Sequence, residues 1–330
     1  MTISTKRTAI LFLFSFISFS GIARKQDSVG VAADIDSTKI LTDTVKDGRF
    51  KTAGEVWKTV VFGVPGDFVQ MGKTVSKDWR VTAAYAGGIA LFVLADKPVT
   101  QWYQDNVEKN VKYKFPKLAN PGNSRFFYGN DAYLNYSIMG LYAGSLIANY
   151  KTGQMAALNS TKALVYSYLI SQVFLKSIFG RRRPDLTLSD GKPAKLPYTD
   201  NPYDFFAIHR LNFTTGPSGT SFPSMHATAY FAVAKVMAME FNNYWIPYGA
   251  VTVLFFADVD AHQHWVGDMV AGGIVGTLIG KGIVLSSRAW EKKQAQRKSI
   301  QNRQNKINFN YQVLPVVSGG MTGLTLHMSL

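Results

Sequence analysis

Six apolar stretches of helical length constrain this chain more than any other feature of its sequence. They are rich in Ala, Gly, Leu, Val and Tyr, and turn-forming runs such as residues 120–123 (Asn-Pro-Gly-Asn) separate them. No alternation of strands with helices indicates a parallel sheet. We therefore predict an all-α fold, a helical bundle with about six core helices. The expected helices cover residues 81–95, 133–148, 163–179, 226–241, 244–257 and 266–285.

The amino-terminal part of the chain differs from this bundle. Lys6 and Arg7 precede a short apolar run that ends in small residues, which is typical of a secretory signal peptide. We expect residues 1–23 to be removed on export, with an uncleaved anchor as the alternative. Residues 24–80 are expected to form an amino-terminal lead-in, flexible at its polar start, and residues 81–287 the helical domain.

The carboxy-terminal residues 288–330 combine a basic segment with a tail in which polar and apolar residues alternate. Because the tail turns at residues 318–320 (Ser-Gly-Gly), it predicts a short C-terminal β-hairpin. The basic segment fits a cytoplasmic flank, a stretch that binds anionic lipid, or a solvated helix face.

The charge balance of the chain indicates an anionic partner. Lys and Arg number 36 against 21 Asp and Glu, which gives a formal net charge of +15 and favours phosphate, phospholipid or nucleic acid. Nucleic acid is disfavoured because aromatic and basic residues are not interleaved along an exposed surface pattern. The absence of cysteine excludes disulfides, thiolate zinc sites and a cysteine nucleophile.

Three short clusters carry the residues that suit phosphate chemistry. The first runs from Lys176 to Pro184, and on a helix Lys176 and Arg183 lie two turns apart on one face. An arginine fork and a lysine point charge together suit a tetrahedral oxyanion. A solvated basic cluster beside a helix end is the simpler interpretation of this motif by itself.

The second cluster, residues 221–226 (Ser-Phe-Pro-Ser-Met-His), leads straight into an apolar helix. A helix start of this kind presents free N–H groups to an anion. Ser224 can add a hydroxyl donor, and His226 suits a general acid for a leaving oxygen. An ordinary capped helix is the alternative.

The third cluster places His264 four residues before Asp268. On a helix the two would share a face, so the carboxylate could hold one ring nitrogen and leave the other as a nucleophile or base. Many helices carry such a pair for structural reasons alone.

Together the clusters read Lys-x6-Arg-Pro, then Pro-Ser-x-His, then His-x3-Asp. In order and spacing the chain resembles the type-2 phosphatidic acid phosphatase and vanadium-dependent haloperoxidase superfamily. The resemblance implies a phosphoric ester hydrolase, similar to acid phosphatases, that needs no metal or cofactor. It implies that His264 attacks phosphorus, Asp268 orients His264 and His226 protonates the leaving group. The phosphate-binding residues that it implies are Lys176, Arg183, Ser224 and the backbone of Met225.

Two positions depart from the family signature. Met225 stands where the family usually has glycine, which preserves the backbone donor. Asp258 stands where the signature has arginine six residues before His264, and the loss of such a donor can cost about 3 kcal/mol. We hypothesise that Arg181 or Arg182 compensates by reaching the phosphate.

Asp258 also opens a rival interpretation. With Asp260, His262, His264 and Asp268 it forms a set of ligands acceptable for zinc or manganese, so a metallohydrolase is one alternative. A haloperoxidase that uses vanadate as its cofactor is another. A catalytically impaired envelope protein that only binds phospholipid is the third.

The expected substrate is an anionic lipid phosphate or diphosphate. Residues 184–223 form a long loop rich in aromatic residues, which we interpret as a lid that receives a lipid chain or as a loop packed on the bundle. The number of membrane crossings stays open because Lys176, Asp268 and Lys281 interrupt two of the apolar segments. We expect a cell-envelope protein that is exported, periplasmic and associated with a membrane surface or bilayer.

Overall fold

The computed structural model describes residues 48–124, 127–207, 213, 220–257, 263–306, 310–319 and 321–329. Within these ranges the chain is helical apart from loops and one hairpin, which confirms the predicted all-α class. The chain consists of two compact units, Met1–Ser286 and Ser287–Leu330. The expected signal peptide, residues 1–23, lies outside the described residues.

All six expected segments are helical, with shifted ends. Residues 163–179 belong to a longer helical stretch that begins at Lys151 and changes its hydrogen-bond spacing in the middle. The last helix runs on to Lys306 because residues 288–306 contain neither Gly nor Pro to end it. The elements are α4 (Trp79–Leu94), α6 (Asp131–Ile147), α7 (Lys151–Ser167) with η4 (Tyr168–Leu175) and α8 (Lys176–Phe179), α9 (Met225–Glu240), α10 (Trp245–Phe256) and α11 (Val266–Lys306).

The lead-in expected over residues 24–80 contains a pair of packed helices from Arg49 onward, and most of the stretch expected to be flexible, residues 24–55, lies outside the described residues. These helices are α2 (Arg49–Phe62) and α3 (Val64–Ser76). Val56 and Val60 of α2 are buried. Asp67 of α3 is buried and lies 2.9 Å from the Lys162 ammonium of α7. Apolar burial and this ion pair fix both helices to the bundle, and neither is visible as a local sequence pattern.

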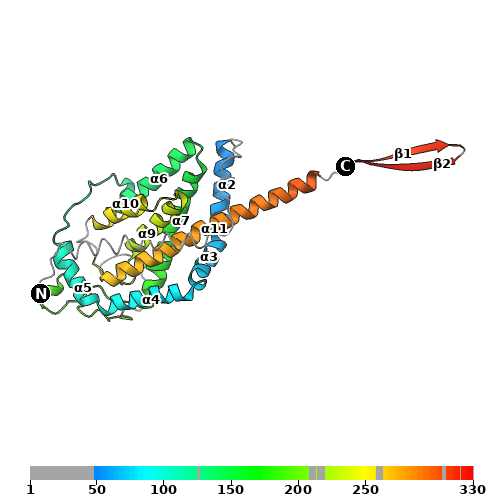
Figure 1. Cartoon of the computed structure of the whole chain (residues 1–330). Helices are drawn as coiled ribbons and strands as arrows, with labels where there is room; N and C mark the ends of the chain where they lie inside the picture. The colour runs from blue at the N-terminus through cyan, green and yellow to red at the C-terminus, as the bar shows by residue number, and fades with distance from the viewer. Residues whose placement is uncertain are drawn as a thin grey trace. The chain divides into compact units, whose positions relative to one another are not determined.

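Helix α9 forms the centre of the first unit and is buried along most of its length. It packs against α7 and α10 and against α11 (Figure 1). Three glycines of α11, at positions 272, 276 and 280, face the α9 backbone, and a Cβ at Gly276 would lie 2.2 Å from the Thr228 carbonyl. The two helices therefore touch backbone to backbone, which brings their amino-terminal ends together.

A further helix, α5 (Asp96–Tyr103), continues into η1 (Gln104–Glu108) and was not expected. The Asp96 carboxylate accepts the Gly267 N–H at 2.7 Å, and the Thr100 hydroxyl accepts the Val266 N–H at 3.1 Å. Thus α5 caps the first turn of α11.

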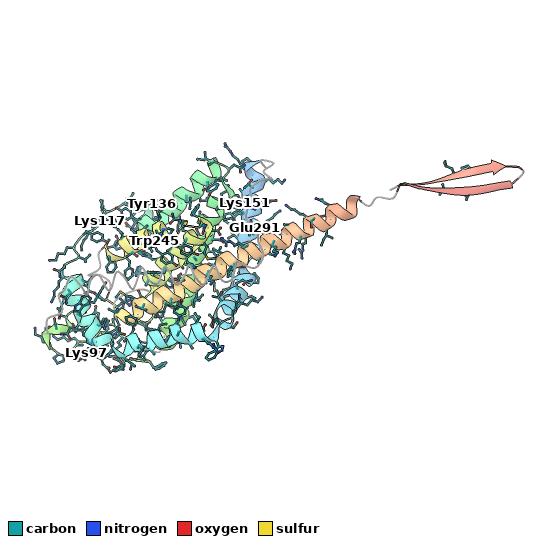
Figure 2. All side chains as sticks on the ribbon, in the orientation of Figure 1. Lys97, Lys117, Tyr136, Lys151, Trp245 and Glu291 are labelled. Atoms are coloured by element: carbon teal, nitrogen blue, oxygen red, sulfur yellow. The ribbon has the colours of Figure 1, made fainter. Side chains whose placement is uncertain are left out.

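The surface of the first unit is both basic and apolar. Lys97, Lys151 and Trp245 lie on the outside of the helices, and Lys117 is exposed in the loop that follows η1 (Figure 2). Among the described residues one helix, Val266–Asn302, is long and apolar enough to cross a bilayer by length and composition, and 67% of its apolar window is buried in the fold. A core helix of a soluble protein meets the same criterion.

The carboxy-terminal unit contains the predicted hairpin. Strands β1 (Asn310–Ser318) and β2 (Met321–Ser329) are antiparallel, and Ser318 pairs with Met321 across the turn. Gly319 adopts a φ of 57° in that turn, a conformation that glycine accepts without strain.

Candidate active site

The first cluster reaches the site by a different route from the predicted one. Lys176 begins α8 and is buried, but the helix ends at Gly180, which adopts a left-handed conformation (φ 51°). Arg183 therefore does not share a helical face with Lys176. It lies in the following loop, is also buried, and interacts electrostatically with Lys176. The turn at Gly180, and not the helical period, brings the two cations together.

The second cluster forms the amino terminus of α9, as predicted. Ser224 is the N-cap residue, and its hydroxyl accepts the Ala227 N–H at 3.5 Å. The Ser224 N–H donates to the Asp268 carbonyl at 2.9 Å. The Met225 side chain packs against the hydrophobic core. The start of α9 thus lies directly beside the first turn of α11.

His264 precedes α11 and so does not share a helical face with Asp268, contrary to the prediction. Both side chains are buried. The distance from His264 Nδ1 to Asp268 Oδ2 is 3.7 Å, longer than a hydrogen bond. The two residues are neighbours in the start of the helix, where the Trp265 N–H also donates to Asp268 Oδ2 at 3.1 Å.

Asp268 is the most heavily hydrogen-bonded carboxylate of the site. Oδ1 accepts a bond from Arg181 at 2.5 Å, and Oδ2 accepts bonds from the Trp265 N–H and the Ser221 hydroxyl. Burial alone raises the pKa of Asp268, but the Arg181 charge, His264 and the Ser221 bond outweigh it and hold the pKa below its usual value. The carboxylate is therefore ionised at neutral pH.

Arg181 is fully buried, and its hydrogen bonds go to groups of the protein core. Its guanidinium donates to Asp268, to Asp96 at 2.8 Å and to the Pro202 carbonyl. It also lies over the rings of Phe205 and Trp265, at 4.7 and 5.1 Å. These contacts overturn the hypothesis that Arg181 compensates for Asp258, because its hydrogen bonds go to the core.

Asp96 shares the Arg181 charge with Asp268. Burial and the neighbouring Asp268 charge raise the pKa of Asp96 to about 6. The backbone bond from Gly267 and the Arg181 guanidinium act in the opposite direction. A single guanidinium thus stabilises two buried carboxylates, one of which also caps α11.

The cations lower the proton affinity of the site. Burial and the Arg183 charge lower the pKa of Lys176 to about 7. Burial, Arg183 and Lys176 likewise hold the pKa of His264 well below its usual value, although the nearby negative charge of Asp268 opposes them. His264 is therefore neutral at pH 7, and a neutral imidazole beside two cations and a helix amino terminus is suited to attack an anionic centre.

His226 lies in the first turn of α9 and has a partner that the sequence did not indicate. Its Nε2 atom is 3.5 Å from Asp131 at the start of α6. The Tyr230 hydroxyl donates to the other oxygen of Asp131 at 3.0 Å. Because 95 residues separate Asp131 from His226, no local spacing could have linked them.

The described part of the long loop, residues 184–207, is packed on the bundle. The Phe206 N–H donates to the Phe179 carbonyl at 2.7 Å, and the Tyr203 hydroxyl donates to the Leu94 carbonyl at 2.9 Å. Tyr203 and Phe206 are nevertheless 53% and 57% exposed. The loop therefore presents aromatic surface while its backbone is fixed.

Several residues of the rival interpretations lie outside the described residues. They are Asp258, Asp260 and His262 of the metal-site hypothesis, together with residues 208–212 and 214–219 of the loop. Arg182 is the other residue that we expected to compensate for Asp258. Its Nε atom lies 3.6 Å from the Asp204 carboxylate. Within the described part of the chain, no group of three or more His, Asp or Glu residues is placed to hold a metal ion.

Comparison with known proteins matches this part of the chain to one family. The model described as PAP2 superfamily matches residues 157–292, a range that contains all three clusters. No curated protein and no solved structure gives a significant match.

The buried Arg181 generates a stability prediction. Arg181→Gln leaves Asp96 and Asp268 without their shared cation, so we expect a loss of about 3 to 5 kcal/mol in the free energy of unfolding. The neighbouring Arg182→Gln is the matched control, because Arg182 is partly exposed and 3.6 Å from its partner; it should change stability by less than about 1 kcal/mol. Denaturant unfolding measures both, and equal losses would contradict the buried network.

Proposed function

Residues 157–292 match the PAP2 superfamily, which includes phosphoric ester hydrolases. From this premise we propose that the protein hydrolyses a lipid phosphate or diphosphate through a phosphohistidine at His264. The observation that carries the proposal is the convergence of buried Lys176, buried Arg183 and the start of α9 on a neutral His264. Neither a metal nor an organic cofactor takes part in the proposed reaction.

In the first step the substrate phosphate binds to Lys176, Arg183, the Ser224 hydroxyl and the backbone N–H of Met225. The Nε2 lone pair of His264 forms a bond to phosphorus while the bond from phosphorus to the leaving oxygen breaks. His226 gives its proton to that oxygen, so that an alcohol or a phosphate leaves. The two buried cations and the start of α9 stabilise the charge on the phosphoryl oxygens.

In the second step a water molecule attacks the phosphorus of the phosphohistidine. The phosphorus–nitrogen bond breaks, its electron pair returns to His264 Nε2, and His226 accepts the proton of the water. Inorganic phosphate leaves, and both histidines regain their starting protonation states. Asp268 stays ionised throughout and fixes the surroundings of His264.

An exposed apolar surface at the end of α4 supports a lipid substrate. The bond from Tyr203 to the Leu94 carbonyl joins the loop to the end of α4, where Leu91 and Leu94 are 67% and 63% exposed. Exposed apolar surface of this kind is typical of sites that meet membranes or lipid chains. We propose that the enzyme works in the cell envelope, after export, on the surface of an anionic membrane.

The proposed mechanism predicts activity without metal. We expect the full chain to release inorganic phosphate from a panel of lipid phosphates in EDTA, and His264→Ala to reduce this rate by about 10³-fold or more. Lys151→Ala, on the exposed start of α7, is the control and should retain full activity. Activity that disappears in EDTA and returns with zinc or manganese would contradict the proposal, as would full activity of His264→Ala.

The position of Lys176 predicts a pH dependence. Because its pKa is lowered to about 7, Lys176 carries its charge below pH 7 and loses it as the pH rises. We therefore expect kcat/KM to fall as the pH rises through about 7. The Lys176→Arg variant keeps its positive charge at higher pH, so its kcat/KM should fall only at a higher pH. Ionisation of the substrate affects the natural protein and the variant equally, so the difference between their pH profiles reports on residue 176. Identical pH profiles for the two proteins would refute the assignment of Lys176 as a phosphate ligand.

A further inference from the structure

The Ser221 hydroxyl lies between the two residues to which the mechanism assigns nucleophile and orienting group. Its Oγ is 3.2 Å from His264 Nδ1 and donates a hydrogen bond to Asp268 Oδ2. The direct distance from His264 Nδ1 to Asp268 Oδ2 is 3.7 Å. Ser221, not the carboxylate, is therefore the group within hydrogen-bond distance of this ring nitrogen.

Proton accounting fixes the direction of both bonds. A serine hydroxyl has one proton to donate and lone pairs that accept. An ionised carboxylate only accepts, so the hydroxyl proton points to Asp268. The hydroxyl then offers a lone pair to His264, which must carry a proton on Nδ1. The unprotonated nitrogen is Nε2, the atom that attacks phosphorus in the proposed reaction.

We propose that Ser221 is a positioning residue that selects the reactive tautomer of His264 by relaying the hydrogen bond between the ring and Asp268. The inference rests on the proposed function and deepens it, because it assigns the orientation of the nucleophile to a hydroxyl in addition to the carboxylate.

The surroundings of Ser221 hold its hydroxyl in this place. Ser221 is fully buried, and its N–H donates to the Arg181 carbonyl at 2.7 Å. The next residue, Phe222, packs edge-on against Phe179 and Phe205, with ring centroids 4.9 and 5.7 Å apart. The side chain of Arg181 meanwhile holds the other oxygen of Asp268. The backbone hydrogen bond, the ring packing of Phe222 and the fixed Asp268 carboxylate thus hold the Ser221 hydroxyl between His264 and Asp268.

Nuclear magnetic resonance of the full chain labelled with ¹⁵N-histidine tests the proposal without any assay of activity. The His264 signals are those that disappear in His264→Gln. In the natural protein we expect protonated Nδ1 and unprotonated Nε2. In Ser221→Ala we expect a shift towards the Nε2-protonated tautomer, and Ser221→Thr, which keeps a hydroxyl, should restore the natural pattern.

A matched control separates this effect from general loss of a buried hydroxyl. Ser286 is also buried and donates to the Gly63 carbonyl at 2.9 Å, outside the site. Ser286→Ala should leave the His264 signals unchanged. Unchanged His264 signals in Ser221→Ala would overturn the proposal, as would equal changes in Ser221→Ala and Ser286→Ala.

Kinetics with a lipid phosphate supply the second measurement. We expect Ser221→Ala to lower kcat roughly 10- to 100-fold, as loss of a partner that orients a histidine does elsewhere, with little change in KM. Ser221→Thr should recover most of kcat. A tautomer shift in a protein that hydrolyses no phosphate ester would uphold Ser221 as a positioning residue and overturn the proposed function. Full hydrolysis with an unchanged tautomer in Ser221→Ala would support the proposed function and overturn Ser221 as a positioning residue.

Discussion

The carboxylate of Asp268 is buried and ionised, and each segment of the site supplies a hydrogen bond to it or to its partner Arg181. The loop after α8 supplies Arg181, the loop before α9 supplies Ser221, and the start of α11 supplies the Trp265 N–H. Asp96 of α5 binds the far side of Arg181. A buried charge is tolerable only with such partners, so the segments must meet for Asp268 to remain an anion.

This arrangement links the fold to the proposed chemistry. Because the glycines of α11 allow the α9 backbone to approach closely, the start of α9, which we propose binds the phosphate, lies beside Asp268. Burial of His264, together with the charges of Arg183 and Lys176, lowers its pKa and keeps that histidine neutral. In the proposed reaction the same two cations attract the phosphate, so substrate binding and preparation of the nucleophile would depend on one cluster of charges.

The sequence predicted what depends on local pattern. Apolar length predicted the six helices, alternation with a glycine turn predicted the hairpin, and the resemblance to a known family indicated which clusters meet. It failed where distant contacts or backbone turns decide the outcome. The helical period suggested that Lys176 and Arg183 share a face, whereas the left-handed Gly180 brings them together. Asp96 and Asp131 reach their partners across 85 and 95 residues, and no neighbouring residue signals either contact.

The central claim is that the three clusters form one anion site with His264 as its nucleophile. A crystal structure of the full chain grown with orthovanadate, which mimics the pentacovalent state of a transferred phosphoryl group, tests it most directly. We expect vanadium bonded to Nε2 of His264, with vanadate oxygens on Lys176, Arg183 and the start of α9. Vanadate bound elsewhere, or bound through Nδ1 of His264, would contradict it.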